Sequence, residues 1–453
     1  MMPSLYTGVT AMNSNQMKID VISNNIANAN TIGYKYQTVS FSDVLNQEIH
    51  GASAPQDDIG GVNPMQVGLG VGVASVSTVT TMGSLQYTGN PTDLAISGDG
   101  YFVVHSPGGE YNFTRAGNFG VDASGNLVTA EGYQVCGWQD VEDQADGTYV
   151  FDTTGDPEPI NIFESGGESN RTIPPNATTE ANISGNLNSS ATQKGDAMND
   201  IGTAITDGET PDYVMPMTVV DSLGAVHEVD VEYYMCYSET SSGTTETSYY
   251  WRAVGEDGNP ITDSVTGDAS EGYVKFDSEG NLIEGDSDYP TSTTIPISPG
   301  GGAAPLEIDM DFSSLTMYGS ESNVLPTHVD GNTAGELTDF SVDSNGVIMG
   351  VYSNGQQKPI GVLCIANFSN PSGLEKSGHN IYQATQNSGS FDGGNPPGVG
   401  GAGIIGVGTL EMSNVDLSRE YSELIVAQRG FQASSSIIST VDELLQDLIN
   451  LKR

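Results

Sequence analysis

The sequence predicts a mainly β protein with α-helical termini, in which the N- and C-terminal helices pair as a coiled coil and β-rich domains are inserted between them. Three observations predict this fold class. Apolar residues recur in alternating steps of three and four at both ends of the chain. Between the ends they alternate with polar residues at period two. Glycine, at 57 of 453 residues, is abundant together with the other residues of tight turns.

The first 26 residues carry a heptad repeat, which predicts an amphipathic helix. Its apolar members are Leu5, Val9, Met12, Ile19 and Ile26. Gln16 and Ser23 occupy two further positions of the repeat and interrupt the stripe. Pro3 suits a first helical turn, and the Asn-rich segment 24–35, with Gly33, is expected to end the helix.

The C-terminal end repeats the pattern and predicts a second helix. Its apolar members are first Leu417, Tyr421, Leu424, Phe431 and Ile438. After a three-residue shift the pattern resumes at Val441, Leu445 and Leu448. Asn414 is the expected N-cap, and Asp416 and Glu420 suit the positive N-terminus of the helix. Gln428 and Ser435 interrupt this stripe, and Gly430 costs the helix ~1 kcal/mol relative to alanine.

Helices with interrupted stripes are marginal in isolation. We therefore expect these two helices to need each other and neighbouring copies of the chain, and to be disordered in the monomer and fold on assembly. Two ordinary helices packed on one globular domain are the alternative. Their position at both extreme ends, around a long β-type sequence, favours paired terminal helices that assemble.

The middle of the chain reads as strands joined by Gly, Asn and Asp turns. One unit recurs as VDASGNLV at 121–128, FDSEGNLI at 276–283 and VDSNGVIM at 342–349. We interpret each copy as a hairpin tip, since a calcium loop needs more oxygen ligands and a terminal Glu. Cys136, Cys236 and Cys364 lie in separate apolar runs and are predicted to be buried strand residues.

Three patches rich in Pro, Gly and Ser, at 155–180, 297–307 and 389–403, mark seams between domains. They predict a middle domain of about 170–310 inserted into a domain that both flanks build.

The chain is strongly acidic, with 58 acidic and 13 basic residues and a net charge of −45. Long-range repulsion opposes binding to nucleic acid or to an anionic membrane. Six of the basic residues lie in the two ends, so the middle is the acidic, solvent-facing part. No apolar run is long enough to span a bilayer, and no cleavable signal peptide begins the chain, so we expect no membrane insertion and export without cleavage.

A search for catalytic motifs is negative. The five histidines form no metal-binding pair, no GxSxG elbow is present, and no phosphate-loop spacing occurs. We therefore expect no enzymatic activity, no catalytic residue, no cofactor and no metal.

The segment SNNIANANTIGYK, residues 23–35, resembles the signature shared by flagellar rod, hook and hook-associated proteins. Its signature residues are Asn24, Asn25, Ala27, Asn28, Thr31, Gly33, Tyr34 and Lys35. Residues 413–453 look like the matching C-terminal end of this axial protein family. Residues 311–320 and 335–390 are similar to the inner β-domain of its hook proteins. Rod proteins of the family are shorter, so the chain length also favours the hook proteins.

The resemblance implies four layers in a tube. They are a helical inner domain (1–27 and 415–453), a connecting region (28–72 and 400–414), an inner β-domain (73–150 and 310–399) and an outer acidic domain (151–309). The apolar members of the two stripes would be the assembly interface.

The resemblance also implies partners and a location. The main partner is the chain itself, in a curved homopolymer that transmits torque. The others are the hook cap, the distal rod, the hook–filament junction proteins and the flagellar type III export apparatus. The expected location is the extracellular part of the flagellum. A distal rod subunit and an acidic, β-rich surface-layer or adhesin protein are the alternatives.

Overall fold

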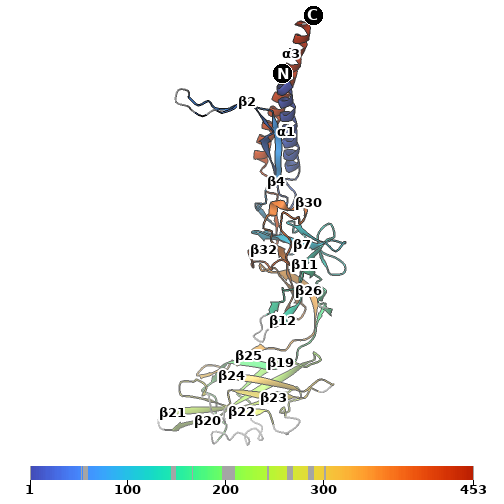
Figure 1. Cartoon of the computed structure of the whole chain (residues 1–453). Helices are drawn as coiled ribbons and strands as arrows, with labels where there is room; N and C mark the ends of the chain where they lie inside the picture. Colours follow the sequence, from blue (N-terminus) through green and yellow to red (C-terminus); the bar gives the residue numbers. More distant parts are fainter. Residues whose placement is uncertain are drawn as a thin grey trace. The chain divides into compact units, whose positions relative to one another are not determined.

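The structure is a computed structural model of the chain, and it describes residues 2–52, 54, 60–143, 149–165, 167–195, 210–241, 244–262, 269–283, 290–299 and 302–451. The chain forms two compact units (Figure 1). The terminal unit comprises Met1–Asn170, Phe340–Gly350 and Lys358–Arg453. The inserted unit comprises Arg171–Asp339 and Val351–Gln357.

The unit boundaries differ from the predicted edges of the outer domain. Residues 151–170 belong to the terminal unit, and residues 310–339 belong to the inserted unit. The reason at the second edge is strand β24, Leu306–Tyr318, which continues through position 310. Its residues Leu306, Ile308, Met310 and Phe312 alternate into one core, so the strand cannot be divided there.

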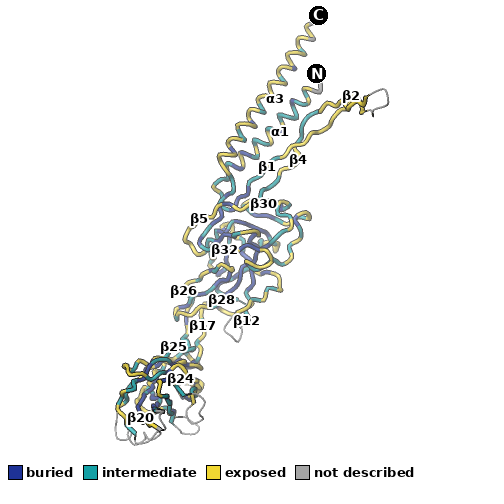
Figure 2. The backbone as a smooth tube through the Cα atoms, turned by 90° about the vertical axis from the view of Figure 1, so that its left-hand side faces the viewer, coloured by how far each residue is buried: buried dark blue, intermediate teal, exposed yellow. Residues whose placement is uncertain are grey.

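The predicted terminal helices are present and pair with each other. Helix α1 spans Met2–Ala27 and helix α3 spans Leu417–Leu451. They lie side by side in both backbone views (Figures 1 and 2). This confirms the predicted fold class of helical ends around β-rich units.

A long two-stranded ribbon follows α1. Strand β1 (Gln37–Asp43) pairs antiparallel with β4 (Val71–Thr78), and β2 (Asn46–His50) pairs with β3 (Met65–Gly68). The ribbon packs against α1 through β1 and β4. Every described residue of β2 and β3 is exposed.

The rest of the terminal unit is a β-domain. Its sheet path runs β28-β11-β7-β8-β31-β30, and small pairs surround it. The strands wholly within this domain are β5 (Leu85–Tyr87), β6 (Leu94–Ser97), β7 (Tyr101–His105), β8 (Tyr111–Thr114), β9 (Gly120–Val121), β10 (Leu127–Val128), β11 (Gln134–Trp138), β12 (Val141–Asp143), β13 (Tyr149–Phe151), β14 (Glu158–Pro159), β15 (Glu164–Ser165), β16 (Glu168–Ser169), β29 (Ile365–Ala366), β30 (Glu375–Gly378), β31 (Ile381–Gln383), β32 (Ile404–Val407) and β33 (Thr409–Glu411). A short 3-10 helix, η1, spans Pro371–Gly373. The chain also crosses between the two units within three strands. They are β26 (Gly335–Val342), β27 (Val347–Tyr352) and β28 (Gln357–Leu363), of which only the first residue belongs to the inserted unit.

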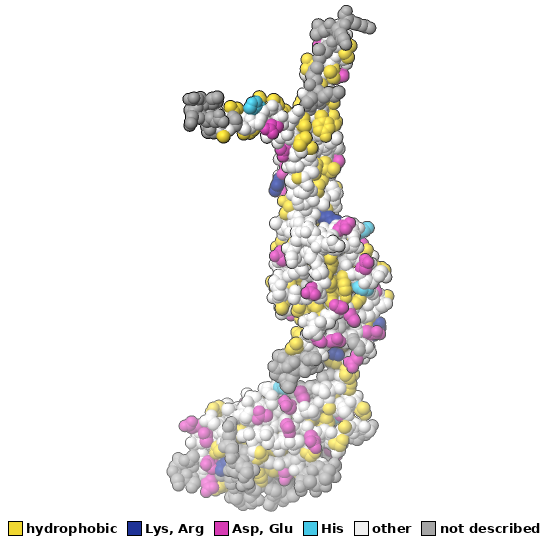
Figure 3. Space-filling view, in the orientation of Figure 1, with side chains coloured by type: hydrophobic (Ala, Val, Ile, Leu, Met, Phe, Trp, Pro, Cys, Tyr) yellow, Lys and Arg dark blue, Asp and Glu magenta, His cyan; other side chains and the backbone are white. Residues whose placement is uncertain are grey.

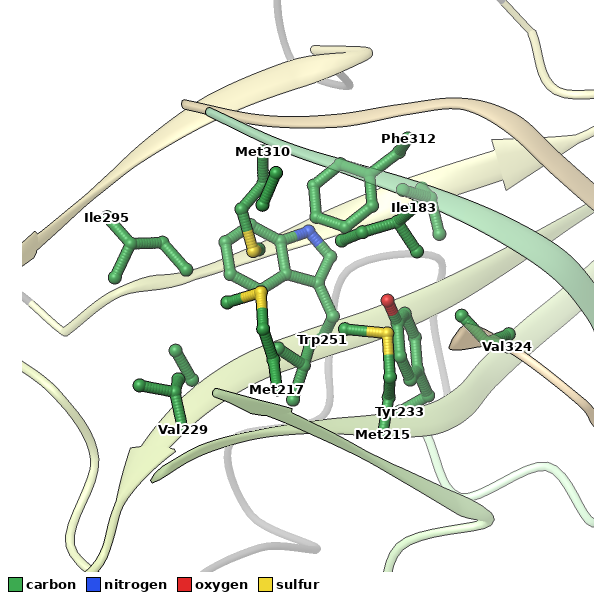
Figure 4. Close-up of a cluster of buried hydrophobic side chains, with 14 of the residues drawn as sticks. Ile183, Met215, Met217, Val229, Tyr233, Trp251, Ile295, Met310, Phe312 and Val324 are labelled. Carbon is green, nitrogen blue, oxygen red and sulfur yellow. The ribbon is translucent and has the colours of Figure 1, made fainter. Parts of the chain in front are cut away.

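The inserted unit is a β-sandwich. One sheet has the order β23-β24-β18-β25 and the other β19-β20-β21-β22. The bounds are β17 (Thr172–Ile173), β18 (Glu180–Asn188), β19 (Tyr213–Val220), β20 (Val226–Ser241), β21 (Thr244–Gly255), β22 (Glu271–Phe276), β23 (Ser292–Ile297) and β25 (Leu325–Val329). Strands β18 and β24 run parallel. Trp251 stands in the core between the sheets, with its ring centroid 5.2 Å from that of Phe312 (Figure 4).

The repeated Asp–Gly units form the predicted hairpin tips. In the first, Asp122 Oδ1 accepts hydrogen bonds from the backbone N–H groups of Ser124 (2.9 Å) and Asn126 (2.8 Å). Asp277 and Asp343 repeat this geometry with the residues two and four positions later. Asp221 forms a fourth tip of the same kind. In each tip the carboxylate satisfies two donors of its own loop, a local role that needs no metal.

These tips predict acid sensitivity. Hydrogen bonds from Asn126 hold the pKa of Asp122 below its ordinary value of 3.8. The ionised form is therefore bound more strongly in the folded chain, and its stabilisation is present above about pH 4 and lost as the pH falls through the lowered pKa. We expect Asp122→Asn to make the thermal melting temperature of the terminal unit less dependent on pH below about pH 4 than in the wild type. Parallel calorimetric profiles for the two chains would contradict this role.

Candidate functional site

The helix pair is the first candidate site, and its contact face combines small and polar residues with a few large apolar ones. A Cβ atom on Gly8 would lie 3.2 Å from Ile438 Cγ1, and one on Gly430 would lie 2.9 Å from Asn15 Oδ1. Lys18 Nζ forms an ion pair with Glu423 Oε2 at 3.3 Å. Residue numbers rise on α1 as they fall on α3 through these contacts, so the helices are antiparallel.

The sequence-predicted stripe lies beside this contact face. On α1 the contacts use positions 8, 15, 18 and 25, each one residue before a position of the predicted repeat. Leu5, Val9, Met12, Ile19 and Ile26 are accordingly half-buried. On α3 the buried series is Glu420, Ala427, Ser434 and Val441, spaced by seven. Small residues let the backbones approach closely, so most of the larger apolar side chains flank the contact.

The predicted residues of α3 divide into two groups. Leu424, Phe431, Ile438 and Leu445 are half-buried, and Ile438 packs against Gly8 of α1. Leu417 and Tyr421 are exposed, Tyr421 by 52%. The side chain of Leu448 lies outside the part of the chain that the structure describes.

The helices expose many large apolar side chains. They are Tyr6, Met17, Leu417, Tyr421, Ile425, Val426, Ile437, Leu444 and Ile449. Figure 3 shows apolar side chains gathered over the two helices on the face in view. Of the apolar residues described within α1 and α3, Ile22, Ala427 and Val441 are the buried ones. The pair therefore keeps little apolar surface from water by itself.

The second candidate site is a buried polar junction between segments 24–37 and 411–420. At its centre Glu411 is fully buried. Its Oε1 accepts hydrogen bonds from Lys35 Nζ (2.6 Å) and from the Gly83 N–H (2.8 Å), and its Oε2 accepts one from Arg115 (3.3 Å). Lys35 also donates to the Thr81 carbonyl at 2.8 Å. One carboxylate therefore holds together the end of the N-terminal segment, the β-domain and the approach to α3.

The electrostatics of the junction depend on this pairing. The Lys35 side chain is 1% exposed and that of Glu411 0%. Burial lowers the pKa of Lys35 below its ordinary value, and the charge of Glu411 acts in the opposite direction. Because a buried charge without a partner is costly, each member of this cluster needs the others.

Asn25 joins the junction to the helix pair. Its amide nitrogen donates to the Gln37 carbonyl (2.8 Å) and to Glu420 Oε2 (3.0 Å). Its amide oxygen accepts from the Gln37 N–H (3.0 Å) and from the Tyr34 hydroxyl (3.3 Å). Asn25 is 1% exposed, so an amide with both donors and acceptors suits a site where each polar atom must be satisfied.

The other signature residues shape the turn after α1. Asn28 donates to the Asn24 carbonyl at 2.9 Å, and the Thr31 hydroxyl donates to Asn28 Oδ1 at 3.1 Å. Gly33 has φ of 69° and its N–H donates to the Glu411 carbonyl at 2.8 Å. Ala27, the last residue of α1, is exposed.

Asp416, and not Asn414, is the N-cap of α3. Asp416 Oδ1 accepts from the N–H groups of Ser418 (2.9 Å) and Arg419 (3.3 Å). Asn414 instead accepts from the Tyr36 N–H (2.9 Å) and donates to the carbonyls of Val79 and Thr81 (both 3.0 Å). The expected N-cap is therefore wrong. The Asn414 amide, which has both a donor and an acceptor, is used in the junction instead.

Two residues of the β30–β31 hairpin complete the junction, and sequence reasoning missed both. Lys376 Nζ donates to the Lys35 carbonyl at 2.9 Å and lies 4.7 Å from the ring centroid of Tyr34. Burial lowers the pKa of Lys376 to about 8. Asn380, with φ of 59°, donates to the Ile32 carbonyl at 2.8 Å. The signal available in the sequence was the Gly–His–Asn run at 378–380, because His and Asn enter the left-handed region more readily than most residues.

Neither a cluster of metal ligands nor a membrane-spanning helix occurs among the described residues. Among them, no three His, Cys, Asp or Glu side chains gather as ligands for a metal ion. No described helix is long and apolar enough to cross a membrane. What the two sites can do is hold the ends of the chain together and offer apolar surface.

Four family models match the chain in sequence order. They are described as flagella basal body rod protein (residues 5–35), flagellar hook protein FlgE/F/G D1 domain (95–186), flagellar basal body protein FlaE D2 domain (186–332) and flagellar basal body rod FlgEFG protein C-terminal (407–451). The first match contains the signature segment, and the last contains Glu411 and α3. Paired terminal helices around inserted β units, with these matches, define an axial subunit of the bacterial flagellum.

Full-length relatives are more specific. The chain is 35% identical to the flagellar hook protein FlgE of Treponema pallidum and 34% identical to that of Borreliella burgdorferi, in each case over 100% of both chains. The chain belongs to the flagellar hook protein family. This is a family of structural proteins, in agreement with the negative search for catalytic motifs.

A relative named as a rod protein also matches the chain. A relative named flagellar basal-body rod protein FlgG, from Bacillus subtilis, is 28% identical over 100% of both chains. The hook proteins of Treponema pallidum and Borreliella burgdorferi are more similar to the chain than this relative is, whereas that of Brucella suis, at 27% identity, is not.

Proposed function

We propose that the chain is a structural subunit of the bacterial flagellar hook, which polymerises into a flexible curved tube and transmits motor torque to the filament. The observation that carries the proposal is the helix pair. It joins the N- and C-terminal segments beside a junction whose central ion pair, Lys35–Glu411, is buried, yet exposes large apolar side chains such as Ile425 and Val426. A second and third copy of the chain are the natural cover for such a surface.

The predicted stripe residues fit this proposal in a modified form. Because they flank the contact between α1 and α3, the half-buried members Leu5, Val9, Met12, Ile19, Ile26, Leu424, Phe431, Ile438 and Leu445 have surface left for neighbouring subunits. Leu417 and Tyr421 are exposed, so they have more surface available for these neighbours. We propose that these side chains form the inner layer of the tube together with the exposed residues of α3.

The ribbon offers a further contact between copies. Its exposed apolar side chains are Phe41, Val44, Leu45, Ile49, Val62, Met65, Val67, Val73 and Val76. Both strands of the β2–β3 segment have an unpaired edge within the described residues. We propose that the ribbon belongs to the connecting region and reaches a neighbouring subunit.

The partners and location follow from the proposed function. They are further copies of this chain, the hook cap, the distal rod, the hook–filament junction proteins and the type III export apparatus, with the hook outside the cell. The family relationship favours this reading over a surface-layer protein or adhesin.

Polymerisation tests the interface. We expect Val426→Asp to abolish filament formation by the purified chain, because Val426 is 67% exposed and a charge there cannot be covered by an apolar neighbour. Gln386→Asp adds the same charge at an exposed polar position of the β-domain, outside the proposed helical interface, and is the matched control. Sedimentation and electron microscopy report the polymer, and circular dichroism checks the fold. Polymers of normal yield from Val426→Asp would exclude this face from the interface.

Hydrogen exchange tests whether the helices fold on assembly. In the monomer we expect rapid exchange of amides at 5–20 and 425–445, since few apolar side chains are buried between the helices. Amides of the junction, at 33–37 and 409–415, are expected to stay protected. Strong protection along both helices in the monomer would contradict folding on assembly.

A further inference from the structure

Two of the three cysteines face each other across neighbouring strands. In the antiparallel pair of β11 and β28, Gly137 lies opposite Leu363 and Trp138 opposite Val362. Continuing this register by one residue places Cys136 opposite Cys364. The Cys364 N–H donates to the Cys136 carbonyl at 3.1 Å, which confirms the pairing.

Both thiols project into the same core. Residues opposite each other in a sheet point to one face, and positions two apart on a strand share that face. Cys136, Cys364, Trp138 and Val362 accordingly belong to one buried cluster of the terminal unit. Both cysteines are 0% exposed. No other chain segment separates the two members of such a directly opposed pair.

The spacing of such a pair suits a disulfide. Hydrogen-bonded residues opposite each other in an antiparallel ladder have Cα atoms about 5.5 Å apart, and disulfides most often join Cα atoms about 5.5–6 Å apart. Cys236 lies in the inserted unit. We propose that Cys136 and Cys364 form an intrachain disulfide when the chain folds in oxidising surroundings, an inference that rests on the proposed extracellular location.

The bond forms by two exchange steps with a small disulfide such as oxidised glutathione. The Cys136 thiolate attacks it, which joins Cys136 to one half and releases the other half as a thiolate. The Cys364 thiolate then attacks the Cys136 sulfur and releases the second half. Two cysteine thiols are oxidised, the small disulfide is reduced to two thiols, and the protons of the cysteines pass to the released thiolates.

Burial decides when this reaction occurs. In the folded terminal unit it raises the pKa of the Cys136 thiol to about 12, and the pKa of Cys364 is also raised. Since the thiolate is the nucleophile, the folded, reduced pair is inert, and the disulfide forms while the chain folds. It then closes a loop, residues 136–364, that contains the whole inserted unit.

Refolding of the purified full-length chain tests the proposal without any flagellum, so its outcome is independent of the proposed function. The unfolded chain is refolded with a mixture of oxidised and reduced glutathione, alkylated and digested with trypsin. The three cysteines fall in separate peptides, 116–171, 195–252 and 276–376, since trypsin does not cleave between Lys358 and Pro359. We expect 116–171 joined to 276–376, with Cys236 alkylated, and a melting temperature roughly 5–10 °C above that of the reduced chain.

Two variants and one order of addition sharpen the test. Cys236→Ser is expected to give the same linked peptides, and Cys364→Ser to leave Cys136 alkylated. Oxidised glutathione added after reductive refolding is expected to give less than a tenth of the linked product. Full alkylation of all three cysteines after oxidative refolding, or a link through Cys236, would overturn the proposal.

Discussion

Replacing Glu411 with alanine is expected to destabilise the terminal unit by about 3–5 kcal/mol, the usual cost of removing one partner of a buried ion pair. The variant leaves Lys35 buried without its carboxylate, and the Gly83 N–H and Arg115 lose the same acceptor. Hydrogen exchange at 33–37 and 409–415 measures the effect where it arises. Urea unfolding measures its size in the terminal unit.

Glu423→Ala is the matched control for Glu411→Ala. Glu423 also accepts from a lysine, Lys18, and it forms a second pair with Arg419, but both pairs are at the surface. Exposed ion pairs contribute about 0–1 kcal/mol, so this variant is expected to unfold almost as the wild type does. Equal effects of the two substitutions would mean that Glu411 does not hold the junction together.

Gly33→Ala is expected to destabilise the terminal unit by about 2–4 kcal/mol, from two sources that add. Gly33 has φ of 69°, a conformation that costs alanine about 1 kcal/mol. A Cβ atom there would also lie 2.7 Å from the Ala116 nitrogen and 2.8 Å from the Arg115 carbonyl carbon, so the turn must move away from the β-domain. The same hydrogen-exchange and urea measurements apply.

Gly132→Ala separates the two sources. Gly132 has φ of 86°, but no atom lies within 4 Å of a Cβ placed on it. This control is expected to lose only the conformational part, about 1 kcal/mol. If Gly33→Ala costs no more than Gly132→Ala, close packing of the turn on the β-domain is not what requires glycine at position 33.

The sequence predicted the architecture because its patterns are long. Period-two alternation in β20 and the repeated apolar steps of α1 and α3 extend over many residues, so one interruption does not hide them. The Asp–Gly hairpin tips were also predictable, since each is built from a short local segment. Asp122 receives its hydrogen bonds from residues two and four positions away.

The contact face of the helices was not predictable in the same way. Apolar periodicity finds the large side chains, whereas the contact itself uses Gly8, Asn15, Ser434 and similar residues. The junction was harder still, since Lys35 meets Glu411 across 376 positions of the chain. Only the resemblance of segment 23–35 to the axial protein signature pointed to it, and that resemblance did not supply the partners Arg115, Lys376 and Asn380.

Immunogold electron microscopy of intact cells and sheared appendages tests the central claim most directly, with an antibody raised against residues 180–310. The account predicts gold on the short curved segment between the cell envelope and the filament. Label distributed over the whole cell surface, or absent from that curved segment, would contradict the assignment of this chain to the hook.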